Sequence, residues 1–308
     1  MGHSWRVSIK LVDMPLMENS LLSKFAFWQT KHDRVDLGVY LNAAEVTFFK
    51  RDSDTSFSLS LSGDDWSGVF QALTDKIPAP NLQLVLSEDF YQLLVVDKPM
   101  VEPEEMHQAL IWSIKDMVSE PVESLHLDYF ESPESTNNKV TVVVVNRAML
   151  QALVKAADKH EVSIGGISIE EMAISNYGAE DKLAHMVLCH KPGSELLLTV
   201  VKQGQLYMQR RIRGFSQIDR VSSQDLQLGV ADNLSLELQR SMDYFESQLR
   251  QAPVASIALL MGGERQVLAQ LLSKNFDQGV EVIACDQVQD KLAQWALVEL
   301  ERQTEEPA

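Results

Sequence analysis

Basic residues are scarce in this 308-residue chain, where 27 Lys and Arg stand against 44 Asp and Glu and give a formal net charge of −17. Nucleic-acid binding needs clustered cations that neutralise phosphates, and wide contact with anionic lipid needs a polybasic surface, so neither partner is expected. Cysteine is nearly absent, because Cys189 and Cys285 are the two in the chain and lie far apart in apolar runs. This usage excludes a disulfide scaffold and a spaced zinc site, and favours a reducing compartment.

Long apolar runs are also missing. A bilayer span needs about 18–20 consecutive apolar residues, whereas the longest candidate, residues 140–145, has the length of a strand. The beginning of the chain lacks the pattern of a secretory leader, so we expect a cytoplasmic protein unless a partner tethers it elsewhere. The histidines show no metal-ligand spacing, and neither a Gly-x-Ser-x-Gly elbow nor a Walker loop occurs. The sequence therefore predicts no catalytic residue and no metal site.

What is present is a 45% apolar composition over a length that suits about two domains or one large two-lobed domain. Residues 1–31 form a mixed N-terminal extension in which Asn19 and Ser20 could cap a short helix. This extension is read either as an element docked on the domain or as an amphipathic surface anchor. The polar residues 301–308 read as an acidic, disordered tail.

One order of elements recurs along the chain. Three strand-like runs at residues 34–40, 44–51 and 56–61 precede a helix over 64–76 and a buried strand over 82–86. The same order returns with runs at 185–189, 195–202 and 205–212, a helix over about 232–249 and a strand over 254–260. A duplicated βββα module predicts a mixed α/β architecture with two similar lobes facing a cleft.

A separate module lies between the two repeats and extends from Phe90 to His160. It reads as a strand, a helix that starts near Pro103, a hairpin with a polar turn at residues 133–138, and a further helix that ends at His160. We therefore expect a first lobe over residues 32–89 with part of 160–180, an inserted α/β subdomain over 90–160, and a second lobe over 161–300.

Four stretches together carry a family resemblance: residues 99–128, 140–175, 234–249 and 256–272. They resemble PilM, the actin-like cytoplasmic protein of type IV pilus machines, and the acidic character is similar to the MshI branch of MSHA pilus biogenesis. The resemblance implies the actin-like fold of ribonuclease H type seen in FtsA, with an inserted subdomain. It also implies binding of the N-terminal tail of a PilN-like (MshJ-like) bitopic membrane protein, in a groove between the first lobe and the subdomain from Phe90 to His160. Other pilus platform proteins are further implied partners, and the implied location is peripheral to the inner membrane.

Many members of that family bind ATP between the lobes, where two hairpin loops hold the phosphates. The first loop runs Asp-x-Gly-Ser-Ser in relatives, and the matching positions are Asp36, Gly38 and then Val39-Tyr40. A β-branched residue and a bulky ring thus replace the small hydroxyls. In the second loop Gly193 survives, but Lys191 stands where a carboxylate would hold Mg²⁺.

A Gly262-Gly263 pair after a strand could approach an adenosine, although such a pair is equally a turn. Because phosphoryl transfer depends on positioned metal and charge, these changes predict that the chain is not an enzyme and needs no cofactor, with a residual ATP site left open.

Two other groups of charges have plainer interpretations. Arg210, Arg211 and Arg213 read as a solvated strand edge rather than an anion site. Glu237 and Arg240 read as a surface ion pair of a helix, although the resemblance places that helix beside the nucleotide cleft.

Three functions follow in order of preference. The first is a non-catalytic pilus assembly scaffold, the second an ATP-binding switch whose nucleotide state controls partner binding, and the third a small-molecule enzyme with its site between the lobes.

Overall fold

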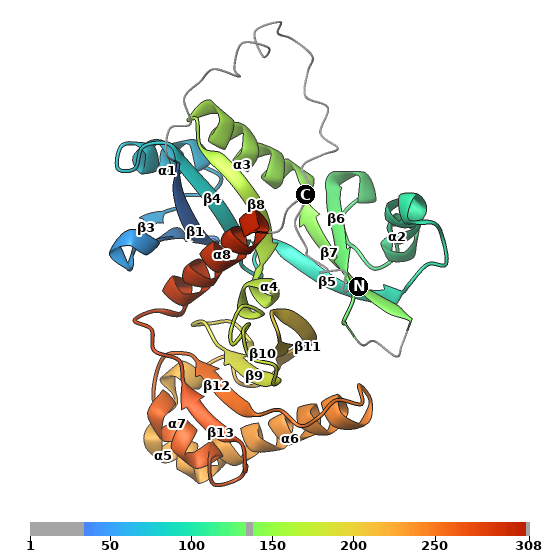
Figure 1. Cartoon of the computed structure of the whole chain (residues 1–308), viewed down its shortest axis with the longest axis vertical. Coiled ribbons are helices and arrows are strands. Elements are labelled where there is room, and N and C mark those ends of the chain that lie inside the picture. Colours follow the sequence, from blue (N-terminus) through green and yellow to red (C-terminus); the bar gives the residue numbers. More distant parts are fainter. Residues whose placement is uncertain (1–33, 134–137, 306–308) are drawn as a thin grey trace, which may run out of the picture.

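The structure is a computed structural model that describes residues 34–133 and 138–305, the last five of these by their backbone alone. The expectations for residues 1–31, for most of the polar turn at 133–138 and for the last three residues lie outside the described residues. Figure 1 shows two lobes stacked along the long axis, with a smaller body beside the upper one.

The first lobe is built on a five-stranded sheet with the order β3-β2-β1-β4-β8. An antiparallel meander of β1 (Val35–Leu41), β2 (Glu45–Lys50) and β3 (Thr55–Ser60) continues into two strands parallel to β1, which are β4 (Pro80–Leu86) and β8 (Ser163–Ile169). The helices α1 (Trp66–Thr74) and α3 (Arg147–Lys159) pack against each other beside this sheet. The closing helix α8 (Val288–Glu305) lies across β1, β2 and β4 (Figure 1).

The second lobe repeats this plan with the order β11-β10-β9-β12-β13. Its strands are β9 (His185–Cys189), β10 (Leu196–Lys202), β11 (Gln205–Ile212), β12 (Ser256–Leu260) and β13 (Gly279–Val282), and its helices are α5 (Ser223–Asp225), α6 (Ala231–Ser247) and α7 (Arg265–Leu272). Strand β9 pairs antiparallel with β10 and parallel with β12, as β1 does with β2 and β4. The predicted duplication of a βββα module in a two-lobed α/β fold is confirmed.

The inserted body has its own three-stranded sheet with the order β5-β7-β6, formed by β5 (Tyr91–Asp97), β6 (Leu125–Phe130) and β7 (Lys139–Asn146). Helix α2 (Met106–Ile114) covers it, with Met106, Leu110 and Ile114 buried. Its core includes Val142 and Val144 of β7, whereas Val143 and Val145 face the core of the first lobe. Strand β7 is therefore buried on both faces, as its unbroken apolar run predicts.

The predicted end of the insert at His160 is wrong, because helix α3 belongs to the first lobe. The Asn146 side chain accepts a hydrogen bond from the Met149 N–H (3.1 Å) and starts the helix directly at the end of β7. The helix then packs on α1, and His160 at its C-terminus lies against that helix, with its ring Nε2 2.7 Å from the Ser67 hydroxyl oxygen. The insert therefore ends at Asn146, and His160 is part of the first lobe.

The closing helix also lies in a different part of the molecule from that expected. Helix α8, predicted within the second lobe, covers the first sheet and runs to Glu305, through part of the expected disordered tail. Among the described helices, none is both long and apolar enough to cross a membrane.

Candidate functional site

Two successive glutamates enter the space between the lobes. Glu170 and Glu171 begin α4 (Glu170–Ile174) immediately after β8, and both are completely buried. The second lobe contributes two cations to this space, which are Lys191, two residues beyond the end of β9, and Arg211 of β11. A buried carboxylate is costly unless it is paired and hydrogen-bonded, so the partners of these two residues define the site.

The Glu170 carboxylate is contacted by residues of both lobes. Its Oε1 accepts hydrogen bonds from the Lys191 Nζ and from the Tyr40 hydroxyl, the latter at 2.7 Å. Its Oε2 lies 3.3 Å from Nη2 of Arg211. Since Tyr40 belongs to β1, Lys191 to the segment after β9 and Arg211 to the edge strand β11, this single carboxylate joins the first lobe to two parts of the second.

Glu171 and Glu88 complete the cluster. The Tyr91 hydroxyl donates to Oε2 of Glu171 at 2.6 Å, and Nη2 of Arg211 lies 3.2 Å from its Oε1. Glu88, just beyond β4, contacts Nη1 of Arg211 at 2.5 Å and Nζ of Lys191 at 3.9 Å. Three carboxylates, two cations and two phenol hydroxyls therefore pair with one another across the lobes.

The pKa values of these groups follow from burial and mutual charge. Burial raises the pKa of Glu171, and the Arg211 guanidinium opposes the shift. Burial, followed by the negative charge of Glu170, holds the pKa of Tyr40 well above its usual range, and burial with Glu171 does the same for the pKa of Tyr91. Both hydroxyls therefore remain protonated and act as donors.

The Arg211 guanidinium stays charged in the same environment. Burial by itself lowers its pKa, but the negative charges of the surrounding glutamates outweigh that effect and leave the pKa raised. A phosphate entering this space would meet three carboxylates and two cations that are already paired with them. The arrangement joins the lobes and offers little to an anionic ligand.

Two predicted site residues lie away from this cluster. Strand β1 runs without a break through Asp36 and Gly38, and the turn that follows it lies at residues 42–44. Asp36 Oδ1 accepts a hydrogen bond from Asn81 (2.7 Å) at the far end of the strand, roughly 17 Å from Leu41 at about 3.3 Å per residue. The prediction that Asp36 and Gly38 form a phosphate loop is therefore not matched by the fold, because the motif falls half a strand too early.

The other predicted residues divide between the cleft and the second lobe. Lys191 is the one that enters the cluster, whereas Gly193 occupies an exposed Pro-Gly turn with φ +83°. Gly262 and Gly263 follow β12, and a Cβ on Gly263 would lie 2.2 Å from the Asp219 carbonyl oxygen. The Asp219 carboxylate is 3.8 Å from the ring of His190, whose pKa is lowered chiefly by burial.

Sequence reasoning missed the acidic side of the site. Arg211, expected on a solvated edge, is 22% exposed and contacts three carboxylates, so that interpretation is wrong for this residue. Arg213 is 92% exposed, as expected. Arg240 pairs with Glu237 at 2.5 Å, as expected for a surface ion pair. A usable signal was the Glu170-Glu171 pair itself, because two charges between apolar runs predict buried, partnered carboxylates.

The paired five-stranded sheets define an actin-like α/β fold. No family model matches the sequence, and no curated protein matches it either. Among solved structures, a PilM–PilN type IV pilus biogenesis complex is similar with a TM-score of 0.58 and 15% identity over 88% of this chain and 99% of that chain. The likeness supports a PilM-like, actin-like fold.

Two further structures are more distantly similar. The cytoplasmic domain of EpsL, an inner-membrane component of the type II secretion system of Vibrio cholerae, has a TM-score of 0.48 and 14% identity over 85% of this chain and 94% of that chain. A protein with an actin-like ATPase fold from Bacteroides thetaiotaomicron has a TM-score of 0.48 and 12% identity over 85% and 95%.

Proposed function

We propose that the chain is a non-catalytic scaffold of a type IV pilus assembly machine, of the MSHA (MshI) kind, at the cytoplasmic face of the inner membrane. The observation that carries the proposal is the buried cluster around Glu170, which uses Lys191 and Arg211 to connect the lobes. An actin-like ATPase needs that space for phosphates and metal, whereas a scaffold benefits from a fixed interlobe geometry.

The proposed partner is the N-terminal tail of a PilN-like (MshJ-like) membrane protein. A pocket of about 320 Å³ lies between the first lobe and the insert and is lined by Phe90, Leu125 and Met149 among others. Asp89 and Glu120 lie among the lining residues. Apolar tail residues would anchor in such a groove, and carboxylates at its rim would steer a basic tail toward it. Tethering by this tail would hold the scaffold at the membrane.

The test is binding of a PilN-like N-terminal peptide to the full chain, followed by hydrogen exchange. We expect protection at residues 89–92 and 118–120, and weaker binding by Glu120→Lys than by Glu123→Lys. Glu123 is a matched control, because it is exposed and lies three residues away, outside the pocket. Protection confined to the second lobe would overturn the assignment of the groove.

The same experiment with ATP and Mg²⁺ separates the scaffold from the ATP-binding switch. A scaffold whose cleft is filled by its own ion pairs binds the peptide equally with and without nucleotide. Micromolar, Mg²⁺-dependent affinity for ATP in titration calorimetry, together with peptide binding that changes when ATP is present, would establish the switch instead.

A further inference from the structure

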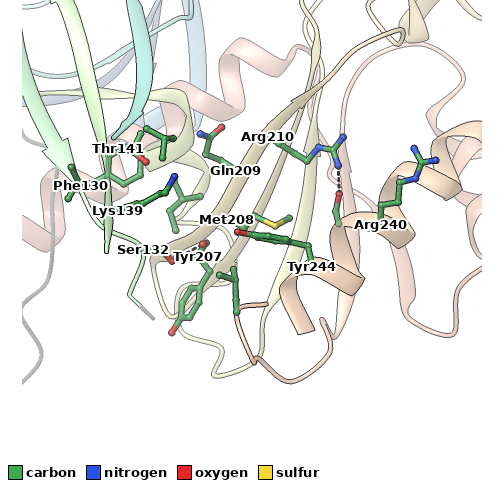
Figure 2. Close-up of a pocket in the computed structure, with 15 residues that line it drawn as sticks. Phe130, Ser132, Lys139, Thr141, Tyr207, Met208, Gln209, Arg210, Arg240 and Tyr244 are labelled. Carbon is green, nitrogen blue, oxygen red and sulfur yellow. Dashed lines mark hydrogen bonds between the residues drawn. The ribbon is translucent and has the colours of Figure 1, made fainter. Parts of the chain in front are cut away.

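A second pocket separates the insert from the second lobe. It has a volume of about 490 Å³, and its lining comes from β5, β6 and β7 on one side and from β11 and α6 on the other. Figure 2 shows Phe130, Lys139 and Thr141 facing Met208 and Tyr244 across it. This pocket shares no lining residue with the groove proposed above for a basic tail.

The wall on the side of the second lobe is the outer edge of the last strand of its sheet. Within the described part of the chain, β11 is the last strand of its sheet and pairs with β10 alone, and residues 206–210 line the pocket without interruption. The pairing with β10 shifts register between Val200 and Val201, opposite Tyr207. Beyond this irregularity every second residue of β11 turns its N–H and C=O away from the sheet, toward an incoming chain. The insert reaches this edge through the Ser132 hydroxyl, which donates to the Tyr207 carbonyl at 2.8 Å.

The pocket combines apolar walls with positive charge. Phe130, Val140 and Leu249 supply buried apolar surface, while Val95 and Tyr244 remain 51% and 44% exposed. A strand added along β11 would cover such half-exposed side chains with every second residue of its own.

The charge of the lining has the opposite sign to that of the chain. Of the described residues that line the pocket, Lys139, Arg210 and Arg240 are charged and none is acidic, although the chain carries a net charge of −17. Glu237, beside the pocket, accepts from both arginines at 2.7 and 2.5 Å, so one carboxylate is shared by two guanidinium groups. Arg240 is 69% exposed and available to a ligand at the same time. A carboxylate-bearing partner is therefore favoured, and a basic segment is repelled.

We propose that this pocket binds an extended, acidic peptide segment of a partner protein as an added strand along β11. Main-chain hydrogen bonds to residues 208–210, beyond the register shift at Tyr207, supply the affinity common to such additions, and side chains that alternate between the two faces supply the specificity. Acidic residues of the segment face Lys139 and Arg240, and its apolar residues contact Phe130 and Val95. The inference stands independently of the proposed pilus function, because it rests on a different pocket and opposite charge.

The test is selection of a display library of random ten-residue peptides on the full chain, with Lys139→Glu/Arg240→Glu as the comparison. Lys155→Glu/Lys274→Glu is the matched control, because it makes the same change in net charge at two exposed residues outside the pocket. We expect selected peptides to be acidic and free of central proline, to bind the pocket variant roughly tenfold more weakly or worse, and to bind the control variant normally. Hydrogen exchange with a selected peptide should protect amides within residues 205–212.

Three results would overturn the inference. The first is that the selected peptides are not enriched in acidic residues. The second is that they bind both double variants with equal affinity. The third is that hydrogen exchange at residues 205–212 does not change when a peptide binds. A PilN-like tail peptide could protect residues 89–92 while the acidic peptides do not bind the pocket. That result would refute peptide binding at this pocket and leave the proposed function intact.

Discussion

Lys191 stands at a position where the resemblance leads one to expect a carboxylate, and its ammonium group neutralises a buried carboxylate of the other lobe. Glu170 is completely buried and is also contacted by Arg211 and by the Tyr40 hydroxyl. A buried ion pair is not by itself stabilising relative to an apolar pair of the same shape, but removal of one partner leaves an uncompensated charge. The role of these residues is therefore best measured by single truncations.

We expect Lys191→Met to lower the free energy of unfolding by about 2–3 kcal/mol, below the upper range for a broken buried pair because Arg211 still contacts Glu170. Urea denaturation measures the change. Arg213→Met is the control, since that side chain is 92% exposed and its loss should cost less than about 0.5 kcal/mol. Equal stabilities of the two variants would contradict the role given to Lys191.

Glu171 makes stability depend on pH in a direction set by its raised pKa. A glutamate in an unfolded chain has a pKa of about 4.3, so the folded chain retains this proton to higher pH than the unfolded chain does. The free energy of unfolding therefore falls as pH rises from about 4.3 through the folded-state pKa. Glu171→Gln removes this dependence.

The measurement is urea denaturation of the wild type and Glu171→Gln from pH 4 to 8. We expect the stability of the wild type relative to the variant to be greatest at the acid end and to decrease as pH rises. Exposed Glu123→Gln should show no such trend. A relative stability that increased with pH would show that pairing with Arg211, rather than burial, determines the pKa of Glu171.

At the scale of elements, the contact between β1 and α8 depends on one glycine. A Cβ built on Gly38 would lie 1.9 Å from the Ala293 carbonyl oxygen and 2.8 Å from the Leu297 nitrogen. Backbone atoms of a helix cannot move aside like the end of a flexible side chain, so the whole of α8 would have to shift.

We expect Gly38→Ala to lower the free energy of unfolding by about 3 kcal/mol, near the upper end of overpacking costs. Gly279→Ala is the matched control, because a Cβ on Gly279 meets nothing within 4 Å. Thermal and urea denaturation compare the two variants. A Gly38→Ala variant as stable as the control would show that α8 does not pack closely on β1 in solution.

The local elements were predictable from the sequence, and their long-range partners were not. Alternating and helical apolar patterns indicated the strands of both modules and the stripe of α6, because burial of one face sets those patterns directly. The phosphate turn was misplaced because the register of β1 with β2, which pairs Leu41 with Val46, fixes the turn, and a short Asp-x-Gly motif does not. Arg211 looked exposed because its counterions come from residues 88, 170 and 171, far away in the chain.

The boundary of the insert was misplaced for the same reason. The helix that ends at His160 was predictable as a helix, but its apolar face does not reveal which sheet it covers. Its partner is α1, whose Ser67 contacts His160 across 93 positions of the chain. A contact of that separation leaves no local pattern in the sequence.

At the scale of the whole molecule, the chain order and the spatial lobes do not coincide. Helix α8 follows the last strand of the second lobe but packs on the first sheet, where Leu292, Ala293 and Leu297 join the first core. Together with the buried cluster at Glu170, this crossing gives the two lobes two separate links.

Because α8 packs on the first sheet, we expect the stability of the first lobe to depend on this C-terminal helix more than that of the second lobe does. The larger apolar side chains of α8 that are buried in the first core, Val288, Leu292, Trp295, Leu297 and Leu300, bury surface worth roughly 10 kcal/mol at about 2 kcal/mol each. That is comparable to the whole stability of a domain, about 5–15 kcal/mol.

A chain truncated after Asp286 should therefore lose hydrogen-exchange protection in β1 and β4 and keep it in β9 and β12, whose core includes Met186, Leu188, Ile257 and Leu259. A synthetic peptide of residues 287–305 added to the truncated chain should restore protection in β1 and β4, whereas a peptide with Leu292 and Leu297 changed to Asp should not. Equal loss of protection in β9 and β12 would mean that the second lobe depends on α8 as much as the first does, and that the two lobes fold as one cooperative unit.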